Sequence, residues 1–215
     1  MNKLSVAIDG PAGAGKSTIA KIVADKLDLM YINTGAMYRA VTVKALEKNI
    51  AFTEIDKLME MISTMDIYFE NDDLFLNGEN INDQITHPNI SKRVSEYASV
   101  REIRVKLVEQ MRKMSEKYNV IMDGRDIGTV VLKDAPYKFF LTASATERAD
   151  RRFKELTGKG LEVNYDEILE DIIKRDEYDT NREVDPLRKA DDALEVDTTG
   201  LNIQEVVSEI LKNIN

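Results

Sequence analysis

Residues 4–17 read LSVAIDGPAGAGKS, and the order of patterns in this stretch decides the fold. The short apolar run at residues 4–8 has the length and composition of a buried parallel strand. A G-x-x-x-x-G-K-S motif follows at once, from Gly10 to Ser17. Residues 17–27 then carry Ile19, Val23 and Leu27 at helical spacing. A strand, a Gly-rich turn and a helix in this order predict a phosphate-binding loop.

The chemistry of this loop explains each position of the motif. Its glycines let backbone N–H groups wrap a phosphate, and the helix that begins near Lys16 adds its positive end. Lys16 is expected to reach the β- and γ-phosphates of a purine nucleotide, and Ser17 to bind Mg²⁺ through its hydroxyl. The predicted nucleotide-binding residues are Gly10, Pro11, Ala12, Gly13, Ala14, Gly15, Lys16, Ser17 and Thr18.

Outside this stretch the chain alternates strand and helix patterns. Four more apolar runs predict strands, at residues 29–33, 120–122, 137–141 and 193–196. Thr34 and Gly35 are expected to form a turn before a helix over residues 36–48, and residues 53–56 match a capping box. Strand and helix in alternation predict an α/β fold: a five-stranded parallel sheet with helices on both faces.

One region breaks this alternation. Residues 66–82 alternate apolar and polar side chains, and Asn77-Gly78 is a hairpin signal. We therefore expect a small antiparallel meander inserted in a helix-rich region. Helices are predicted after it, at about 89–97 and 101–118.

Composition excludes several classes of protein. The chain has 215 residues, a formal net charge of −9, no cysteine and one histidine. Without cysteine there are no disulfides and no thiolate metal sites, which fits a reducing cytoplasm. The negative charge argues against binding nucleic acid or an anionic membrane, and no apolar stretch approaches the ~20 residues of a membrane span. We expect a cytoplasmic monomer, because no long apolar stripe remains once the core is satisfied.

Arginines recur at the predicted strand ends and helix starts. Arg39 lies one turn into the second helix, and Arg125 lies just beyond the strand at 120–122, between Asp123 and Asp126. Parallel sheets bind ligands at the carboxyl ends of their strands, so Arg39 and Arg125 flank the same edge as the Gly-rich loop. The guanidinium fork gives bidentate bonds to phosphate and never loses its proton. A second phosphate-bearing ligand is therefore expected beside the nucleotide.

Four motifs together carry a resemblance to a known family. In order they are GPAGAGKST, NTGAMYR, DGRDIGTVV, and RDEYDTNR followed by DPL. The chain resembles the bacterial cytidylate kinases, which are P-loop nucleoside monophosphate kinases that phosphorylate CMP and dCMP from ATP with Mg²⁺. The resemblance implies a P-loop NTPase fold in a single chain, 1–215. Its core would be 1–33, 119–147 and 164–215, its monophosphate-binding region with the β insert 34–118, and its mobile lid 148–163.

The resemblance also implies roles for named residues. Lys16, Arg125, Arg148, Arg152 and Arg182 would be catalytic, with Arg148 and Arg152 closing from the lid over ATP. The CMP phosphate would be held by Thr34, Arg39, Arg125 and Arg182. Cytosine would be read by Ser95, Arg104 and Asp126, and the sugar contacted by Arg175 and Asp179. Asp123 would anchor Mg²⁺ through water, Tyr38 would lie near the acceptor, and Tyr178 stands where many relatives carry a charged residue.

Two other functions stay open at this point. One is a kinase of the same architecture that acts on UMP, AMP or a small metabolite. The other is a nucleotide-sensing module without turnover, although a sensor has no need to surround a second phosphate with arginines. Phosphoryl transfer is expected to be direct, since the single histidine, His87, lies in a turn-like context.

Overall fold

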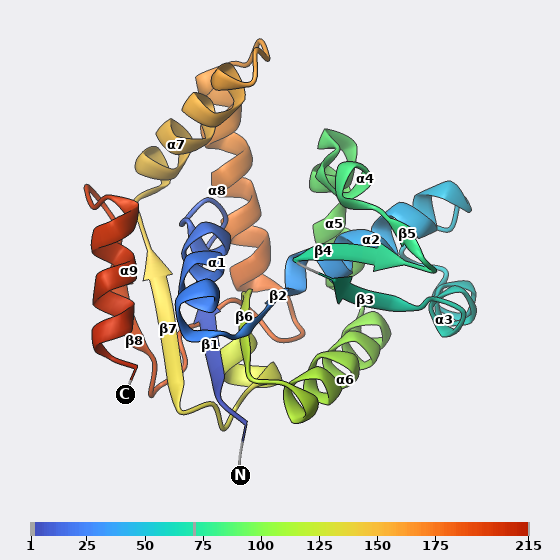
Figure 1. The fold of residues 1–215 in the computed structure, drawn as a ribbon. Helices are drawn as coiled ribbons and strands as arrows, with labels where there is room; N and C mark the ends of the chain where they lie inside the picture. Colours follow the sequence, from blue (N-terminus) through green and yellow to red (C-terminus); the bar gives the residue numbers. More distant parts are fainter. Residues whose placement is uncertain (1–2, 71, 215) are drawn as a thin grey trace.

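A parallel sheet forms the centre of the computed structural model, which describes residues 3–70 and 72–214 (Figure 1). Within those residues the sheet has five strands in the order β2-β6-β1-β7-β8, and every pairing is parallel. The strands are β1 (Ser5–Asp9), β2 (Met30–Asn33), β6 (Val120–Gly124), β7 (Tyr137–Thr142) and β8 (Leu194–Asp197). The α/β class and the five-stranded parallel sheet predicted from the sequence are confirmed.

Successive side chains of the sheet enter two separate cores. Val6 and Ile8 of β1 pack with the helices α1 (Lys16–Leu27) and α9 (Ile203–Lys212) on one face. Ala7 packs on the other face with α2 (Thr34–Glu47), α6 (Arg101–Lys117) and the π-helix η1 (Ile127–Val131). Because strand side chains alternate between the two faces, a strand buried on both sides is apolar throughout. This explains the continuous apolar run at the start of the chain.

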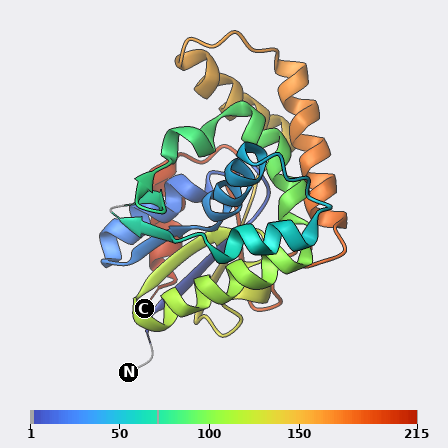
Figure 2. The same cartoon turned by 90° about the vertical axis from the view of Figure 1, so that its right-hand side faces the viewer.

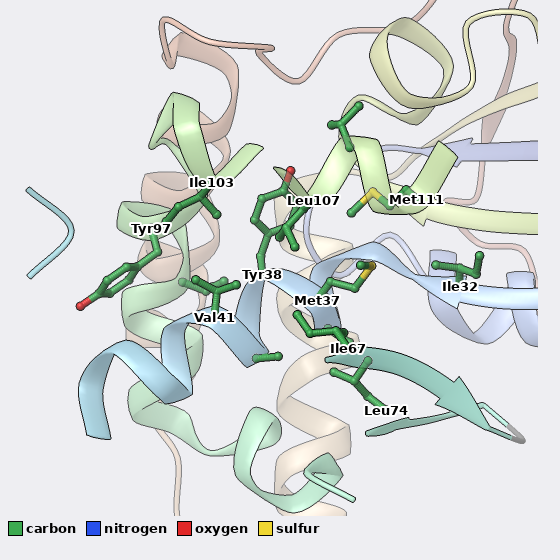
Figure 3. Packing of buried hydrophobic residues seen from close by; sticks show 14 of the residues in the cluster. Ile32, Met37, Tyr38, Val41, Ile67, Leu74, Tyr97, Ile103, Leu107 and Met111 are labelled. Atoms are coloured by element: carbon green, nitrogen blue, oxygen red, sulfur yellow. The ribbon is translucent and has the colours of Figure 1, made fainter. Parts of the chain in front are cut away.

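A second lobe lies beside the sheet and contains the predicted meander. Its strands are β3 (Ile67–Glu70), β4 (Asp73–Leu76) and β5 (Glu79–Asn80), and they pair antiparallel. Asn77 and Gly78 both have positive φ, as a hairpin turn requires. The lobe also contains α3 (Ile55–Ser63), α4 (Asn82–Thr86) and α5 (Pro88–Ala98). Figure 3 shows its core, in which Met37 and Val41 of α2 lie among residues of α6 and the meander.

Two long helices project from the core as an antiparallel pair. They are α7 (Ala145–Gly158) and α8 (Tyr165–Asn181), and they pack along each other (Figures 1 and 2). Asn164 caps α8, because its side chain accepts from the backbone N–H groups of Asp166 and Glu167. The pair contains the segment 148–163, for which the sequence predicts a mobile lid.

Two sequence predictions were wrong in detail, and two short elements were not predicted. Thr34 and Gly35 are the first turn of α2 and not a turn before it, because the Asn33 side chain accepts from the backbone N–H of Ala36 and caps the helix one residue earlier. Residues 53–56 form no capping box, since the Glu54 carboxylate accepts from the backbone N–H of Ala51 instead. Neither α4 nor η1 was anticipated, because each is only five residues long.

In the part of the chain that the structure describes, no helix is long and apolar enough to span a membrane.

Candidate active site

The Gly-rich loop lies at the carboxyl end of β1, where its geometry admits little but glycine. Gly10 has φ of 144°, and a Cβ at this position would collide with the backbone carbonyl of Leu141. Gly15, with φ of 84°, occupies the N-cap of α1. The Lys16 ammonium donates to the carbonyl of Pro11 at 2.7 Å, so the side chain folds back across the loop. Burial and the charge of Arg125 hold the pKa of Lys16 well below its usual value, which an anionic ligand would reverse.

Hydroxyl groups surround Asp123 at the carboxyl end of β6. Ser17 donates to Asp123 Oδ2 at 2.9 Å, and Tyr31 donates to Oδ1 at 2.8 Å. Thr34 donates to the Asp123 backbone carbonyl at 2.7 Å. Mg²⁺ prefers oxygen ligands, keeps several waters and commonly takes only one or two protein groups beside the phosphates. The neighbouring oxygens of Ser17 and Asp123 fit this ligand set, although residues 3–70 and 72–214 contain no group of three or more acidic or histidine side chains placed to hold a metal ion by themselves.

Three arginines and one aspartate lie next to the loop. Asp179 of α8 accepts from Arg125 Nε at 2.9 Å, and Arg175 Nε lies 4.0 Å from the same carboxylate oxygen. Arg175 Nε is buried and makes no hydrogen bond to any described residue. Arg39 likewise has no hydrogen bond or ion pair within the described ranges. Positive charge is therefore in excess here.

The pKa values follow from this excess. Burial, with the charges of Arg125 and Arg39, lowers the pKa of Arg175 to about 9. Burial and then Arg125 also lower the pKa of Arg39. Burial opposes the ionised form of Asp179, but the charges of Arg125 and Arg175 hold its pKa below the ordinary value. A carboxylate fully ionised among several guanidinium groups does not neutralise them all, so the cluster can bind an anion.

A second charged group lies at the start of η1. The buried Arg104 of α6 donates from Nη2 to Asp126, from Nε to Asp185 at 2.8 Å, and from Nη1 to the Ala98 carbonyl at 3.1 Å. Burial raises the pKa of Asp126, against the opposing charges of Arg104 and Arg182. The Arg104 guanidinium also stacks over the Tyr38 ring, 5.4 Å from its centroid. Donors and an acceptor thus meet beside an aromatic face.

Two predicted site residues have partners that the sequence did not show. Arg182 ion-pairs with Asp126 at 3.4 Å and donates to the Asp185 carbonyl, so it contacts the Arg104 group directly. Arg148 is buried and donates to the Ala12 and Ala143 carbonyls at 2.9 and 3.0 Å, which fixes it to the loop.

The remaining predicted residues are more loosely placed. Arg152 lies on the exposed side of α7 and pairs with Glu155 at 2.8 Å. Ser95 lies on α5, one turn before the Ala98 carbonyl that Arg104 contacts. Tyr178 is 41% exposed on α8.

Sequence reasoning missed three residues that hold the site together. Asp9, the last residue of β1, accepts from the backbone N–H groups of Ile127 and Gly128 at 2.7 Å each. Its burial raises its pKa to about 7. Tyr31 and Asp185 hold Asp123 and Arg104 respectively. A carboxylate at the end of an apolar run is a signal that could have identified Asp9, whereas Tyr31 and Asp185 depend on contacts distant in sequence.

A phosphate-binding loop and a second cation cluster at one edge of a parallel sheet define a kinase of the P-loop class. Comparison with known proteins identifies the family. The cytidylate kinase family model matches residues 6–215. The cytidylate kinase of Clostridium perfringens is 74% identical over 98% of this chain and 97% of its own, and that of Clostridium acetobutylicum is 57% identical over 99% and 98%. The chain belongs to the cytidylate kinase family.

Solved structures at low identity agree with the fold alone. An uncharacterized protein from Eubacterium ventriosum aligns with a TM-score of 0.57 at 14% identity, over 99% of this chain and 98% of its own. A gluconokinase from Sinorhizobium meliloti aligns with a TM-score of 0.51 at 14% identity, over 99% and 91%.

Proposed function

We propose that the chain transfers the γ-phosphoryl group of ATP to CMP or dCMP, giving ADP and CDP or dCDP, by direct in-line transfer. The observation that carries this proposal is the excess of positive charge beside the Gly-rich loop. Lys16, Arg39, Arg125 and Arg175 lie at one sheet edge. Asp179 is the counter-charge of Arg125 and Arg175, and Asp123 is that of Lys16 and Arg39. Two phosphates that repel one another can be brought together only if such a cluster neutralises both.

The acceptor phosphate is assigned to Arg39 and Arg125, with Thr34 at their side. Arg39 makes no hydrogen bond or ion pair to the described residues and feels only the nearby negative charge of Asp123, so an incoming phosphate would supply its first direct partner. Arg175, placed on the sugar by resemblance, lies close enough to Lys16 to lower that residue's pKa. We therefore assign it a share of the phosphate charge as well. Alignment and charge stabilisation account for most of the catalysis in phosphoryl transfer, and no phosphoenzyme is needed.

The base is assigned to Arg104 and Asp126, with Tyr38 beside them. An Asp126 oxygen would accept from the 4-amino group of cytosine, and Arg104 would donate toward the O2/N3 edge. Uracil carries an acceptor in place of that amino group, so the same carboxylate would repel it. Asp179 would contact the sugar, and Ser95 would complete the base pocket.

Ser17 and Asp123 would hold Mg²⁺, Asp123 through water, and the ion would neutralise charge on the transferred phosphoryl group. Tyr31 and Thr34 fix the Asp123 side chain and backbone, and so orient that corner before any ligand arrives. The lid would exclude water from ATP. Arg148 is already held against the loop, so the moving part would begin beyond it, toward Arg152 and residues 153–163.

A panel of acceptors tests this function. ADP release with ATP and Mg²⁺ is measured against CMP, dCMP, UMP and AMP, and turnover is expected with CMP and dCMP. Preferred turnover of UMP or AMP would assign the chain another acceptor, and tight ATP binding with no product from any acceptor would favour a sensor. Asp126→Ala should lower the CMP to UMP ratio of kcat/KM by about tenfold, which corresponds to the loss of one charge-assisted hydrogen bond. We also propose that the protein acts as a monomer in the cytoplasm, which size-exclusion chromatography and fractionation would test.

A further inference from the structure

The loop after α8 contains Asp185, which contacts both Arg104 and Arg182. It comprises residues 182–187, and the backbone N–H of Leu187 donates back to the Asp179 carbonyl at 2.8 Å, which fixes the loop to the helix end. Asp185 in this loop has φ of 49°, and Pro186 follows it. A residue before proline is normally extended, and a non-glycine residue with positive φ is strained. Strain of this kind persists only where the surroundings hold the residue in place.

Both the side chain and the main chain of Asp185 make such contacts. Its carboxylate accepts from Arg104 Nε at 2.8 Å, and its backbone carbonyl accepts from Arg182 Nε at 2.6 Å. The same two arginines face Asp126, since Arg104 Nη2 donates to Oδ2 and Arg182 Nη2 lies 3.4 Å from Oδ1. These contacts form a closed ring of four residues, Asp126, Arg104, Asp185 and Arg182, in which the link between Asp185 and Arg182 is made by the Asp185 main-chain carbonyl.

The ring leaves Arg104 with a defined set of free donors. A guanidinium group has five N–H donors, and in Arg104 three of them are taken by Asp185, Asp126 and the Ala98 carbonyl. The side chain is only 2% exposed, so the remaining two N–H groups point where these three contacts direct them. Without Asp185 the Nε–H would lose its partner, and the guanidinium plane would be fixed on two sides instead of three.

We propose that Asp185 is a positioning residue that sets the specificity of the acceptor site for cytosine. Its carboxylate orients Arg104, and its left-handed backbone presents the carbonyl that orients Arg182, so that both arginines face Asp126. The inference rests on the proposed function, because the ring matters for specificity only if Asp126 and Arg104 read the base.

Three substitutions separate the two contributions of Asp185. Asp185→Gly removes the carboxylate but accepts positive φ without strain, Asp185→Ala removes the carboxylate and also resists that conformation, and Asp185→Asn keeps an acceptor oxygen in a residue that tolerates it. Asp185→Gly and Asp185→Ala should both raise KM for CMP about three- to tenfold and lower the CMP to UMP ratio of kcat/KM by a similar factor. KM for ATP should change by less than about twofold, and Asp185→Asn should recover part of the loss.

A matched control reports backbone strain alone. Asp28 has φ of 52° at the end of α1, and its side chain makes no hydrogen bond or ion pair to the described residues. Asp28→Ala and Asp185→Ala should both lower the unfolding temperature, but Asp28→Ala should leave the KM for CMP and the CMP to UMP ratio of kcat/KM unchanged.

The outcomes distinguish this inference from the function on which it rests. If the wild-type protein phosphorylates no pyrimidine monophosphate, the proposed function fails and the role of Asp185 fails with it. If the wild type phosphorylates CMP, but Asp185→Gly retains the wild-type CMP KM and CMP to UMP ratio, the positioning role alone is wrong. If Asp185→Gly raises KM for CMP and KM for ATP by the same factor, Asp185 is a structural residue and the positioning role is likewise wrong.

Discussion

Replacing Arg175 by methionine is expected to stabilise the unliganded protein while lowering its activity. Arg175 has a pKa of about 9, compared with roughly 12.5 for a free guanidinium. At about 1.36 kcal/mol per pH unit, the folded state disfavours this charge by up to ~5 kcal/mol. The side chain is 27% exposed, so solvent and relaxation reduce the figure, and we expect a gain of about 2 kcal/mol.

The sign follows from linkage. For a base whose pKa is lower in the folded state, the unfolded chain binds more protons between about pH 9 and 12.5, so stability rises across that window. Below about pH 9 both states are charged, and the penalty from Arg175 is fully present at pH 7. Methionine has a similar unbranched shape without the charge. Urea unfolding at pH 7 in a buffer free of phosphate measures the gain, and ADP release measures an expected loss in kcat/KM for CMP of at least about tenfold.

Arg151 provides a control in which the same substitution should lower the stability instead of raising it. It is 31% exposed, close to the value for Arg175, but its guanidinium donates to Glu147 and to both the hydroxyl and the carbonyl of Thr198. Arg151→Met breaks these bonds and should destabilise the protein by about 1–3 kcal/mol. The reasoning is refuted if Arg175→Met is less stable than wild type, or if it retains wild-type kcat/KM for CMP.

Three further predictions concern neighbouring residues. Arg125→Ala should lower kcat/KM for CMP by at least about tenfold while ATP still binds in a calorimetric titration, and a near-normal value for CMP would contradict its role. Tyr31→Phe leaves a buried carboxylate oxygen of Asp123 unpaired, so it should cost about 1.5–3 kcal/mol of stability and raise the Mg²⁺ concentration needed for half-maximal activity. The control is Tyr97→Phe, which removes a 2.8 Å hydrogen bond to the Ile50 carbonyl and should leave the Mg²⁺ dependence of activity unchanged. The pKa of Asp9 is raised to about 7 in the folded protein, so the folded state binds more protons than the unfolded chain between about pH 4 and 7. As the pH rises through this window, the free energy of unfolding of the wild type should fall by up to about 4 kcal/mol relative to that of Asp9→Asn. A difference between the two proteins that does not change with pH in urea unfolding would rule this out.

Local patterns were sufficient to predict the core of the fold. The apolar runs of the sheet strands are short and bounded by turn signals, and each becomes a parallel strand within one or two residues of its expected limits. The Gly-rich loop was predictable because strand, motif and helix are contiguous in sequence. The start of α2 was missed because Asn33 was assigned to a strand, although its side chain also caps the helix that follows.

The site was predictable in part, and the limit is physical. Arg39 and Arg125 could be placed at one sheet edge because each follows a strand. The partners of Arg104 and Arg182 could not, because they depend on a loop 81 residues away in the chain from Arg104 and on the backbone conformation of one strained residue. Sequence periodicity carries no information on a hydrogen bond made by a main-chain carbonyl.

The two halves of the proposed acceptor site differ in how their charges are compensated, and this difference suggests a division of labour. In the ring around Asp126 two carboxylates face two guanidinium groups, so a base that enters must exchange one set of bonds for another. Exchange of this kind yields little net affinity but penalises a base that cannot reproduce the lost bonds. Arg39 and the Nε of Arg175 make no hydrogen bond to the described residues, so a phosphate would add counter-charge there without displacing a partner. Affinity should therefore come mainly from the phosphate and selectivity mainly from the base. The excess charge destabilises the empty enzyme, which the phosphate then relieves.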